Sequence, residues 1–374
     1  MLKTTATDLP PTEPTNPPPP SLWGSCPGVL VYLVSNVFSV TLLNTPGRVY
    51  KSLAFFLCGM ASAYQNLLSA PATATTLIGG AIYYGCWIMW ILLALVTLAI
   101  VAMCLYVTKT INAHRLEAHA EARQAIRQGV VNRSIAVEPA YDLYFPKVMA
   151  KHKTGPSIGS RREATSGLML FPGALLDHHA YGVIASKLAA RGMVVVVPNC
   201  DPIRLPSPAL GANAAFFVKT VKELKDKHNI TVVDWSIGGH SLGAHAAAAM
   251  LDEVRDKVSK LVMWGVYTLP GINLSYSPAQ ILLVTATNDG FRFADETAEK
   301  NLFGKLPVRV GAMEKSTAGT TFWYDVLGGN HAGFANYGPQ LYYKVDGERT
   351  ITREEQHRQV VQVVSDFVMG VKES

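Results

Sequence analysis

The sequence predicts an α/β protein with a mostly parallel sheet covered by helices on both faces, preceded by one or more transmembrane helices. Two observations carry this prediction. From about residue 167 onward, short apolar runs alternate with longer amphipathic segments, as strands alternate with helices in such folds. Before that point, residues 77–107 contain no charged side chain. About 20 apolar residues are enough for a helix to cross a bilayer.

Composition narrows the class of protein further. The 374-residue chain is 49% hydrophobic and 16% charged, and the apolar excess lies mostly in its first third. The formal net charge is +6, but no dense run of Lys and Arg with interleaved aromatic residues occurs, so nucleic acid is not an expected partner. The five cysteines show no spacing typical of a metal site. We therefore expect neither a metal nor a cofactor.

Shifts in composition divide the chain into four regions. They are a Pro-rich tail, a membrane region, a linker with a charged helix, and the α/β domain, at residues 1–27, 28–107, 108–165 and 166–374. The tail has too few apolar side chains to form a core, so we expect it to be disordered. The charged helix is expected over residues 110–130, which are rich in alanine and charge.

The membrane region contains one strong span at 77–107 and two weaker candidates. Residues 29–43 and 53–68 are apolar but short for a full crossing, so the number of spans stays open between one and three. Arginine and lysine gather directly after the strong span, and such flanks face the cytosol. We therefore expect an integral membrane protein, with the lipid bilayer as a partner and the α/β domain in the cytosol.

Within the α/β domain, the pattern predicts six strands and five helices. The strands are expected at residues 168–171, 193–198, 236–239, 260–265, 281–285 and 321–327. The helices are expected at residues 180–191, 214–227, 242–254, 296–301 and 353–369. The run MVVVVP at 193–198 is almost continuously β-branched, which is typical of a strand buried on both faces of a parallel sheet. Residues 152–166 are expected to form a loop or an early hairpin.

The strongest motif is Gly-His-Ser-Leu-Gly at 239–243, between a predicted strand and a predicted helix. This context is typical of a nucleophile elbow, a sharp turn that exposes a serine hydroxyl above the sheet. The flanking glycines are needed because a Cβ there would collide with the neighbouring strand or helix. Ser241 is therefore the candidate nucleophile, and we expect His240 to pack and orient rather than to act as the base.

A serine hydroxyl needs a base, and two residues further along the chain complete the set. Asp289 follows the strand predicted at 281–285, and His331 follows the strand predicted at 321–327. Both therefore lie at carboxyl ends of strands, where open α/β sheets place their sites. His331 is the expected base, and Asp289 is expected to orient its imidazole.

The oxyanion needs backbone donors as well. The N–H of Leu242 is one candidate, and the loop after the first predicted strand supplies the other, from Ala174 or from Gly173 instead. His178 and His179 follow this loop. They could line a substrate pocket or lie on the surface, and we favour the surface.

These motifs make residues 166–371 resemble the α/β-hydrolase superfamily, in particular the branch called alpha/beta hydrolase family 5. The matching pieces are Phe171-Pro172-Gly173 with Tyr181, the elbow at 239–243, Asn288-Asp289-Gly290, the run 329–340, Asp346-Gly347, and the run 351–356. The resemblance implies the α/β-hydrolase fold, a complete Ser-Asp-His triad with Asp289 rather than Asp295 as the acid, and no large lid. The chain departs from the family in having Ala174 where a second glycine is frequent.

The sequence thus predicts a membrane-anchored serine hydrolase that cleaves carboxylic esters through an acyl-enzyme. Its expected partner is a small ester, and the membrane segment favours an apolar one, such as a lipid or acyl ester. Two alternatives stay open. One is a thioesterase or acyltransferase with the same triad, and the other is a non-catalytic membrane scaffold with a hydrolase-like domain.

Overall fold

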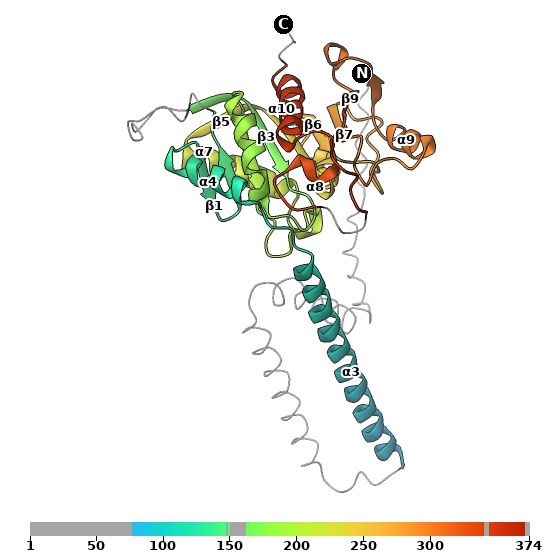
Figure 1. Ribbon diagram of the computed structural model, residues 1–374. Coiled ribbons are helices and arrows are strands. Elements are labelled where there is room, and N and C mark those ends of the chain that lie inside the picture. The colour runs from blue at the N-terminus through green and yellow to red at the C-terminus, as the bar shows by residue number, and fades with distance from the viewer. Residues whose placement is uncertain (1–76, 147–148, 150–161, 340–343, 371–374) are drawn as a thin grey trace, which may run out of the picture. The chain divides into compact units, whose positions relative to one another are not determined.

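The computed structural model describes residues 77–146, 149, 162–339 and 344–370 (Figure 1). The chain divides into two compact units, Met1–Thr97 and Leu98–Ser374. The expected tail and the candidate spans at 29–43 and 53–68 lie outside the described residues.

Helix α3 (Leu77–Ala113) contains the strong apolar segment. Among the described residues, this helix alone is long and apolar enough to cross a membrane, over Trp87–Tyr106. Its large side chains are exposed, for example Leu98 at 65% and Leu105 at 65%. An apolar surface of this kind is unusual for a helix that faces water.

The charged helix expected over 110–130 is interrupted in the structure. Helix α3 ends at Ala113, and helix α4 (Ala120–Val131) begins after an extended segment. In that segment, Leu116 forms a parallel bridge with Leu176, and Ala118 forms an antiparallel bridge with Tyr337. Helix propensity is a weak local preference, and backbone pairing with the folded domain overrides it here.

A nine-stranded sheet forms the centre of the second unit, in the order β1-β2-β4-β3-β5-β6-β7-β9-β8. The strands are β1 (Ile135–Glu138), β2 (Tyr141–Tyr144), β3 (Arg162–Phe171), β4 (Val194–Pro198), β5 (Ile230–His240), β6 (Val258–Trp264), β7 (Gln280–Ala286), β8 (Val308–Val310) and β9 (Thr320–Val326). Strand β2 pairs antiparallel with β1 and β4, and all other neighbours are parallel. The six predicted strands and the mostly parallel sheet are confirmed.

The structure extends this sheet beyond the expected strands. Strands β1 and β2 lie within residues 108–165, which the sequence pattern assigned to a linker, and β3 already begins at Arg162, within the segment expected to form a loop or hairpin. Strand β8 was also not expected. The short hairpin escaped detection because Asp142 breaks the apolar run of β2, although all four residues of that strand are buried.

Helices cover both faces of the sheet, as predicted. They are α6 (Gly182–Ala190), α7 (Ala214–His228), α8 (Leu242–Met250), α9 (Glu296–Phe303) and α10 (Arg353–Met369), together with the 3-10 turns η2 (His178–Tyr181), η3 (Pro208–Leu210), η4 (Leu251–Glu253), η5 (Met313–Lys315) and η6 (His331–Phe334). One core joins α4, α6 and α10 to the sheet, and the other joins α7, α8 and α9 to it. Because strand side chains alternate between faces, β2, β3, β4, β6 and β7 each contribute buried residues to both cores.

Candidate active site

Strand β5 leads directly into the sharp turn that carries Ser241. The backbone of Ser241 has φ 53° and ψ −121°, a strained conformation for a residue with a side chain. Its N–H donates to the Trp264 carbonyl at 2.8 Å, which ties the turn to the end of β6. A Cβ on Gly239 would collide with the Gly243 backbone, and one on Gly243 would collide with the carbonyls of Phe171 and Pro172. The turn therefore requires glycine on both sides of Ser241, as the motif indicated.

The parallel register brings the functional loops to one edge of the sheet. The last residues of β5 and β6 are paired, His240 with Trp264, and the last residues of β7 and β9 are paired, Ala286 with Val326. The chain leaves each of these strands on the same side. Asp289 follows β7 and His331 follows β9, so two residues 42 positions apart meet above the carboxyl ends of their strands.

Asp289 and His331 form a buried hydrogen-bonded pair. The His331 Nδ1 lies 2.8 Å from Asp289 Oδ2, and the two residues are 3% and 5% exposed. The other carboxylate oxygen, Oδ1, accepts the Phe291 N–H at 2.8 Å. A carboxylate on Nδ1 favours the tautomer that leaves Nε2 free to accept a proton.

His240 and Gly265 connect Ser241 with this pair. The His240 ring, adjacent to Ser241 in the chain, lies 4.4 Å from the His331 ring between centroids. A Cβ on Gly265, the residue after β6, would come within 3.0 Å of His331 Nδ1 and 3.3 Å of Asp289 Oδ2. Burial, and to a lesser extent the nearby His331, holds the pKa of His240 well below its usual value. His240 therefore stays neutral and adds no like charge beside His331.

Asp346 joins the loop after β7, which carries Asp289, to the loop after β9, which carries His331. The sequence did not reveal this role. Its Oδ1 accepts the N–H groups of Gly290 and His331 at 3.0 and 3.2 Å, and its Oδ2 accepts the Ala332 N–H at 2.8 Å. From α10, the buried Gln356 exchanges two hydrogen bonds with the Asn330 backbone, at 3.2 and 2.8 Å. Both residues lie in the runs that carried the family resemblance, which was the only signal for them.

The structure separates the two candidates for the oxyanion donor. The Gly173 N–H already donates to the buried Tyr181 hydroxyl at 2.8 Å, and that hydroxyl lies 2.9 Å from His240 Nδ1. By contrast, the N–H groups of Ala174 and Leu242 have no hydrogen-bond partner within the part of the chain that the structure describes. Of the three expected donors, Leu242 and Ala174 therefore have N–H groups available for an oxyanion.

A separate cavity of about 960 Å³ lies away from this edge. Its lining includes Lys260 near the start of β6, Gln280 at the start of β7, and side chains from the second half of α10. Ser241, Asp289 and His331 stand at the carboxyl ends of their strands, and none of them lines this cavity.

The fold and the site together define an α/β protein with a buried His–Asp pair and a serine on a strained strand-to-helix turn, whose chain neighbour His240 lies against the histidine of the pair. The model of the Alpha/beta hydrolase family matches residues 167–358. The match spans just over half of the chain, so the chain belongs to the alpha/beta hydrolase family.

Other comparisons give more distant similarity. No curated protein sequence matches the chain significantly. Among solved structures, a ferulic acid esterase from Streptomyces cinnamoneus is 17% identical with a TM-score of 0.43, over 56% of this chain and 69% of that one. An arylesterase is 16% identical with a TM-score of 0.36, over 66% and 92%. An esterase from Pyrobaculum calidifontis is 14% identical with a TM-score of 0.39, over 67% and 91%.

Proposed function

We propose that this protein is a membrane-anchored serine hydrolase that cleaves carboxylic esters with Ser241, His331 and Asp289. The observation that carries the proposal is the buried Asp289–His331 pair, 2.8 Å apart, together with a serine held at φ 53° whose neighbour His240 contacts His331. Backbone strain of this kind is retained where the surrounding structure enforces it, often at functional sites.

The chemistry follows from the positions of these groups. His331 takes the Ser241 proton while Oγ attacks the ester carbonyl carbon, and the N–H groups of Leu242 and Ala174 stabilise the resulting oxyanion. The intermediate then expels the alcohol, which receives the proton from His331. A water molecule attacks the acyl-enzyme in the same way, gives its proton to His331, and releases the carboxylic acid as Ser241 recovers its hydrogen.

An apolar ester is the substrate class that the surroundings favour. The Phe291 ring lies 4.7 Å from the His331 ring between centroids, so apolar surface adjoins the base. The exposed apolar helix over Trp87–Tyr106 supports a membrane location, where such esters concentrate. Basic residues directly after this helix favour a catalytic domain in the cytosol.

Labelling with a fluorophosphonate probe tests the proposal on the full chain in detergent. We expect the native protein to react and to hydrolyse p-nitrophenyl esters, with a preference along a series of acyl chains. Ser241→Ala should abolish both activities. Ser259→Ala is the matched control, because Ser259 is exposed and bonds only to Asp234 in the described structure.

Asp289→Asn should keep the fold and lower kcat by about 10⁴, since the wrong imidazole tautomer is then favoured. Faster turnover of thioesters than of oxygen esters would move the assignment to a thioesterase. A folded native protein that neither reacts with the probe nor turns over any ester would leave the scaffold as the better description.

A further inference from the structure

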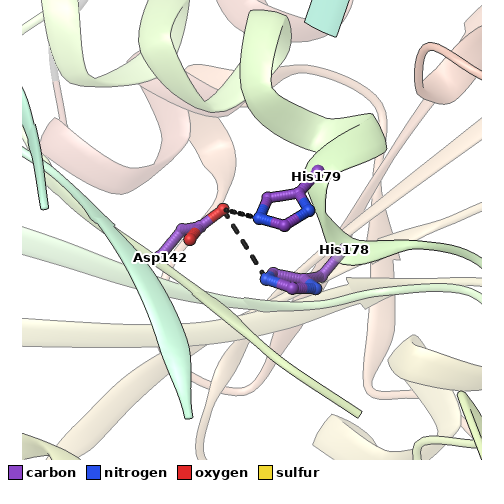
Figure 2. Close-up of side chains that lie close together, drawn as sticks. All are labelled: Asp142, His178 and His179. Atoms are coloured by element: carbon purple, nitrogen blue, oxygen red, sulfur yellow. Dashed lines mark ion pairs between the residues drawn. The ribbon is translucent and has the colours of Figure 1, made fainter. Parts of the chain in front are cut away.

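A second cluster of ionisable side chains lies outside the proposed active site, around Asp142 on β2. The Asp142 Oδ2 lies 3.7 Å from His178 Nε2 and 3.6 Å from His179 Nε2 (Figure 2). One ligand atom from each of the three residues lies within 4.8 Å of the others. The sequence gave no sign of this cluster, because β2 and η2 come together only in the folded sheet.

Asp142 is the feature of this cluster that needs an explanation. It is 0% exposed, on the sheet face that α4 and α6 cover. Its Oδ1 has no hydrogen-bond partner among the described residues, and Oδ2 has only the Tyr144 hydroxyl, at 3.4 Å. The two imidazole contacts, at 3.6 and 3.7 Å, are longer than hydrogen bonds. A buried carboxylate with so little compensation is costly unless a cation neutralises it.

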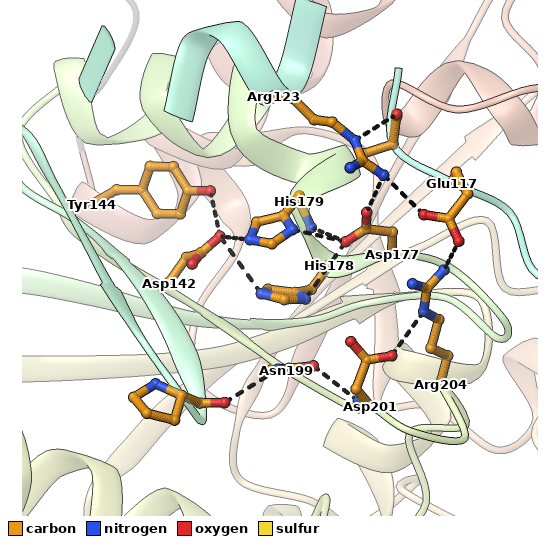
Figure 3. A network of polar contacts seen from close by, with 12 residues as sticks. Glu117, Arg123, Asp142, Tyr144, Asp177, His178, His179, Asn199, Asp201 and Arg204 are labelled. Atoms are coloured by element: carbon orange, nitrogen blue, oxygen red, sulfur yellow. Dashed lines mark hydrogen bonds and ion pairs between the residues drawn. The ribbon is translucent and has the colours of Figure 1, made fainter. Parts of the chain in front are cut away.

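Asp177, a second carboxylate near the cluster, orients the imidazole of His179 so that its Nε2 could bind a cation together with Asp142. His179 Nδ1 lies 3.0 Å from Asp177 Oδ1, so a proton on Nδ1 is favoured and the Nε2 lone pair faces Asp142. Asp177 is itself held by Arg123, at 3.1 Å, in a network that continues through Glu117 to Arg204 (Figure 3). A carboxylate behind a ligating histidine is the usual outer contact of a metal site.

We propose that Asp142, His178 and His179 bind a divalent transition-metal ion, with Zn²⁺ the best fit. Two atoms that bind one tetrahedral zinc ion at about 2.0–2.2 Å lie about 3.3–3.5 Å apart. The two spacings between Asp142 Oδ2 and the imidazole nitrogens, 3.6 and 3.7 Å, are close to this, and all three ligand atoms lie within 4.8 Å of one another. Imidazole nitrogens select such ions over Mg²⁺ and Ca²⁺, which prefer oxygen. Three protein ligands leave one position for water, and the His179 side chain, 32% exposed, gives the ion access from solvent.

The bound ion would brace the loop that carries the oxyanion donor. His178 and His179 begin the 3-10 turn η2, which directly follows the loop of Ala174, while Asp142 belongs to the sheet strand β2. Metal ligation would therefore cross-link the loop to the sheet and stabilise the folded state. This site does not depend on the proposed ester hydrolysis, because its test measures metal binding.

Metal content of the full chain in detergent tests the proposal. The protein is purified without a histidine tag, stripped with a chelator, and titrated with Zn²⁺ against a chromogenic competitor. We expect one zinc ion per chain and a higher melting temperature with zinc. His179→Gln and Asp142→Asn should weaken binding by more than about 100-fold, and Asp177→Asn by about 10–100-fold.

His119→Gln is the matched control, since His119 is exposed and lies outside the cluster. It should bind zinc as the native protein does. A folded native protein without stoichiometric zinc would overturn the proposal. Binding that survives in both His179→Gln and Asp142→Asn would equally overturn it. If Asp142→Asn does not fold, His179→Gln decides, because its side chain is already partly in solvent.

Discussion

Replacing Tyr181 by phenylalanine tests how the loop of Gly173 and Ala174, which carries the proposed oxyanion donor, is held in place. The Tyr181 side chain is fully buried, and its hydroxyl accepts the Gly173 N–H at 2.8 Å and lies 2.9 Å from His240 Nδ1. Phenylalanine fills the same space without the hydroxyl. Both partners then remain buried and lose this hydrogen bond.

The structure allows the size of the effect to be worked out. A buried polar group that loses its partner costs about 1–3 kcal/mol, and Tyr181→Phe creates two. Part of this cost is returned because the buried hydroxyl no longer has to be desolvated. We therefore expect the free energy of unfolding to fall by about 2–4 kcal/mol, which lowers Tm by roughly 4–16 °C in a domain of about this size.

Activity should fall as well, because the released Gly173 N–H no longer fixes the position of Ala174. A displacement of about 1 Å in a catalytic group costs up to about 100-fold, so we expect kcat to fall by about 10–100-fold with a smaller change in KM. Thermal unfolding and ester kinetics on the same preparation measure both effects.

The matched control is Tyr324→Phe, which removes a part-buried hydroxyl that bonds to Gln359 of α10, where both residues line the separate cavity. It should cost at most about 1 kcal/mol and leave kcat unchanged. If Tyr181→Phe were as stable as Tyr324→Phe, the reasoning that one hydroxyl satisfies two buried groups would be refuted.

Two further predictions concern the elbow and the acid stability of the domain. Gly243→Ala should lower Tm and reduce labelling of Ser241, because the new Cβ would collide with backbone carbonyls, and overpacking costs about 1–3 kcal/mol. Gly311→Ala, with open space at its Cβ, should behave as native, and an unaltered Gly243→Ala protein would contradict the elbow geometry. Burial, with nearby positive charges, lowers the pKa of His357 from 6.5 to about 3. The unfolded state therefore binds the proton first as pH falls below about 6.5, and stability is lost from there toward about pH 3, by up to about 1.4 kcal/mol per pH unit. His357→Gln should reduce the stability loss between about pH 7.5 and pH 5 by about 2 kcal/mol in thermal unfolding, and equal losses in both proteins would count against a buried neutral imidazole.

Much of the fold was predictable because its signals are local. The β-branched run at 193–198 forms β4, and the helix predicted over 353–369 begins and ends at those residues as α10. The Gly-His-Ser-Leu-Gly spacing indicated a strained turn, and Ser241 has positive φ. The spacing of apolar residues, the turn residues and the helix caps depend on neighbours in the chain, so they can be recognised in the sequence.

Other features escaped prediction because they depend on contacts between distant segments. Residues 114–119 leave the expected helix because Leu116 and Ala118 bridge to Leu176 and Tyr337. The β1–β2 hairpin joins the sheet although Asp142 obscures its apolar pattern. In each case the free energy of long-range pairing outweighs a local preference of a few tenths of a kcal/mol per residue, about the size of helix propensities.

The sequence by itself thus determined the alternation of strands and helices, the order Ser241, Asp289, His331 along the chain, and the apolar helix before them. Only the tertiary structure decided which groups meet. Parallel register brought Asp289 to His331. The Tyr181 hydroxyl accepts the Gly173 N–H, so that, within the described residues, Ala174 rather than Gly173 has a free N–H in this loop. Sheet order placed Asp142 against His178 and His179. The sequence specifies which side chains each segment carries and its local structure. The packing of segments far apart in the chain specifies the distances between these side chains, their burial and their hydrogen-bond partners, which govern the chemistry.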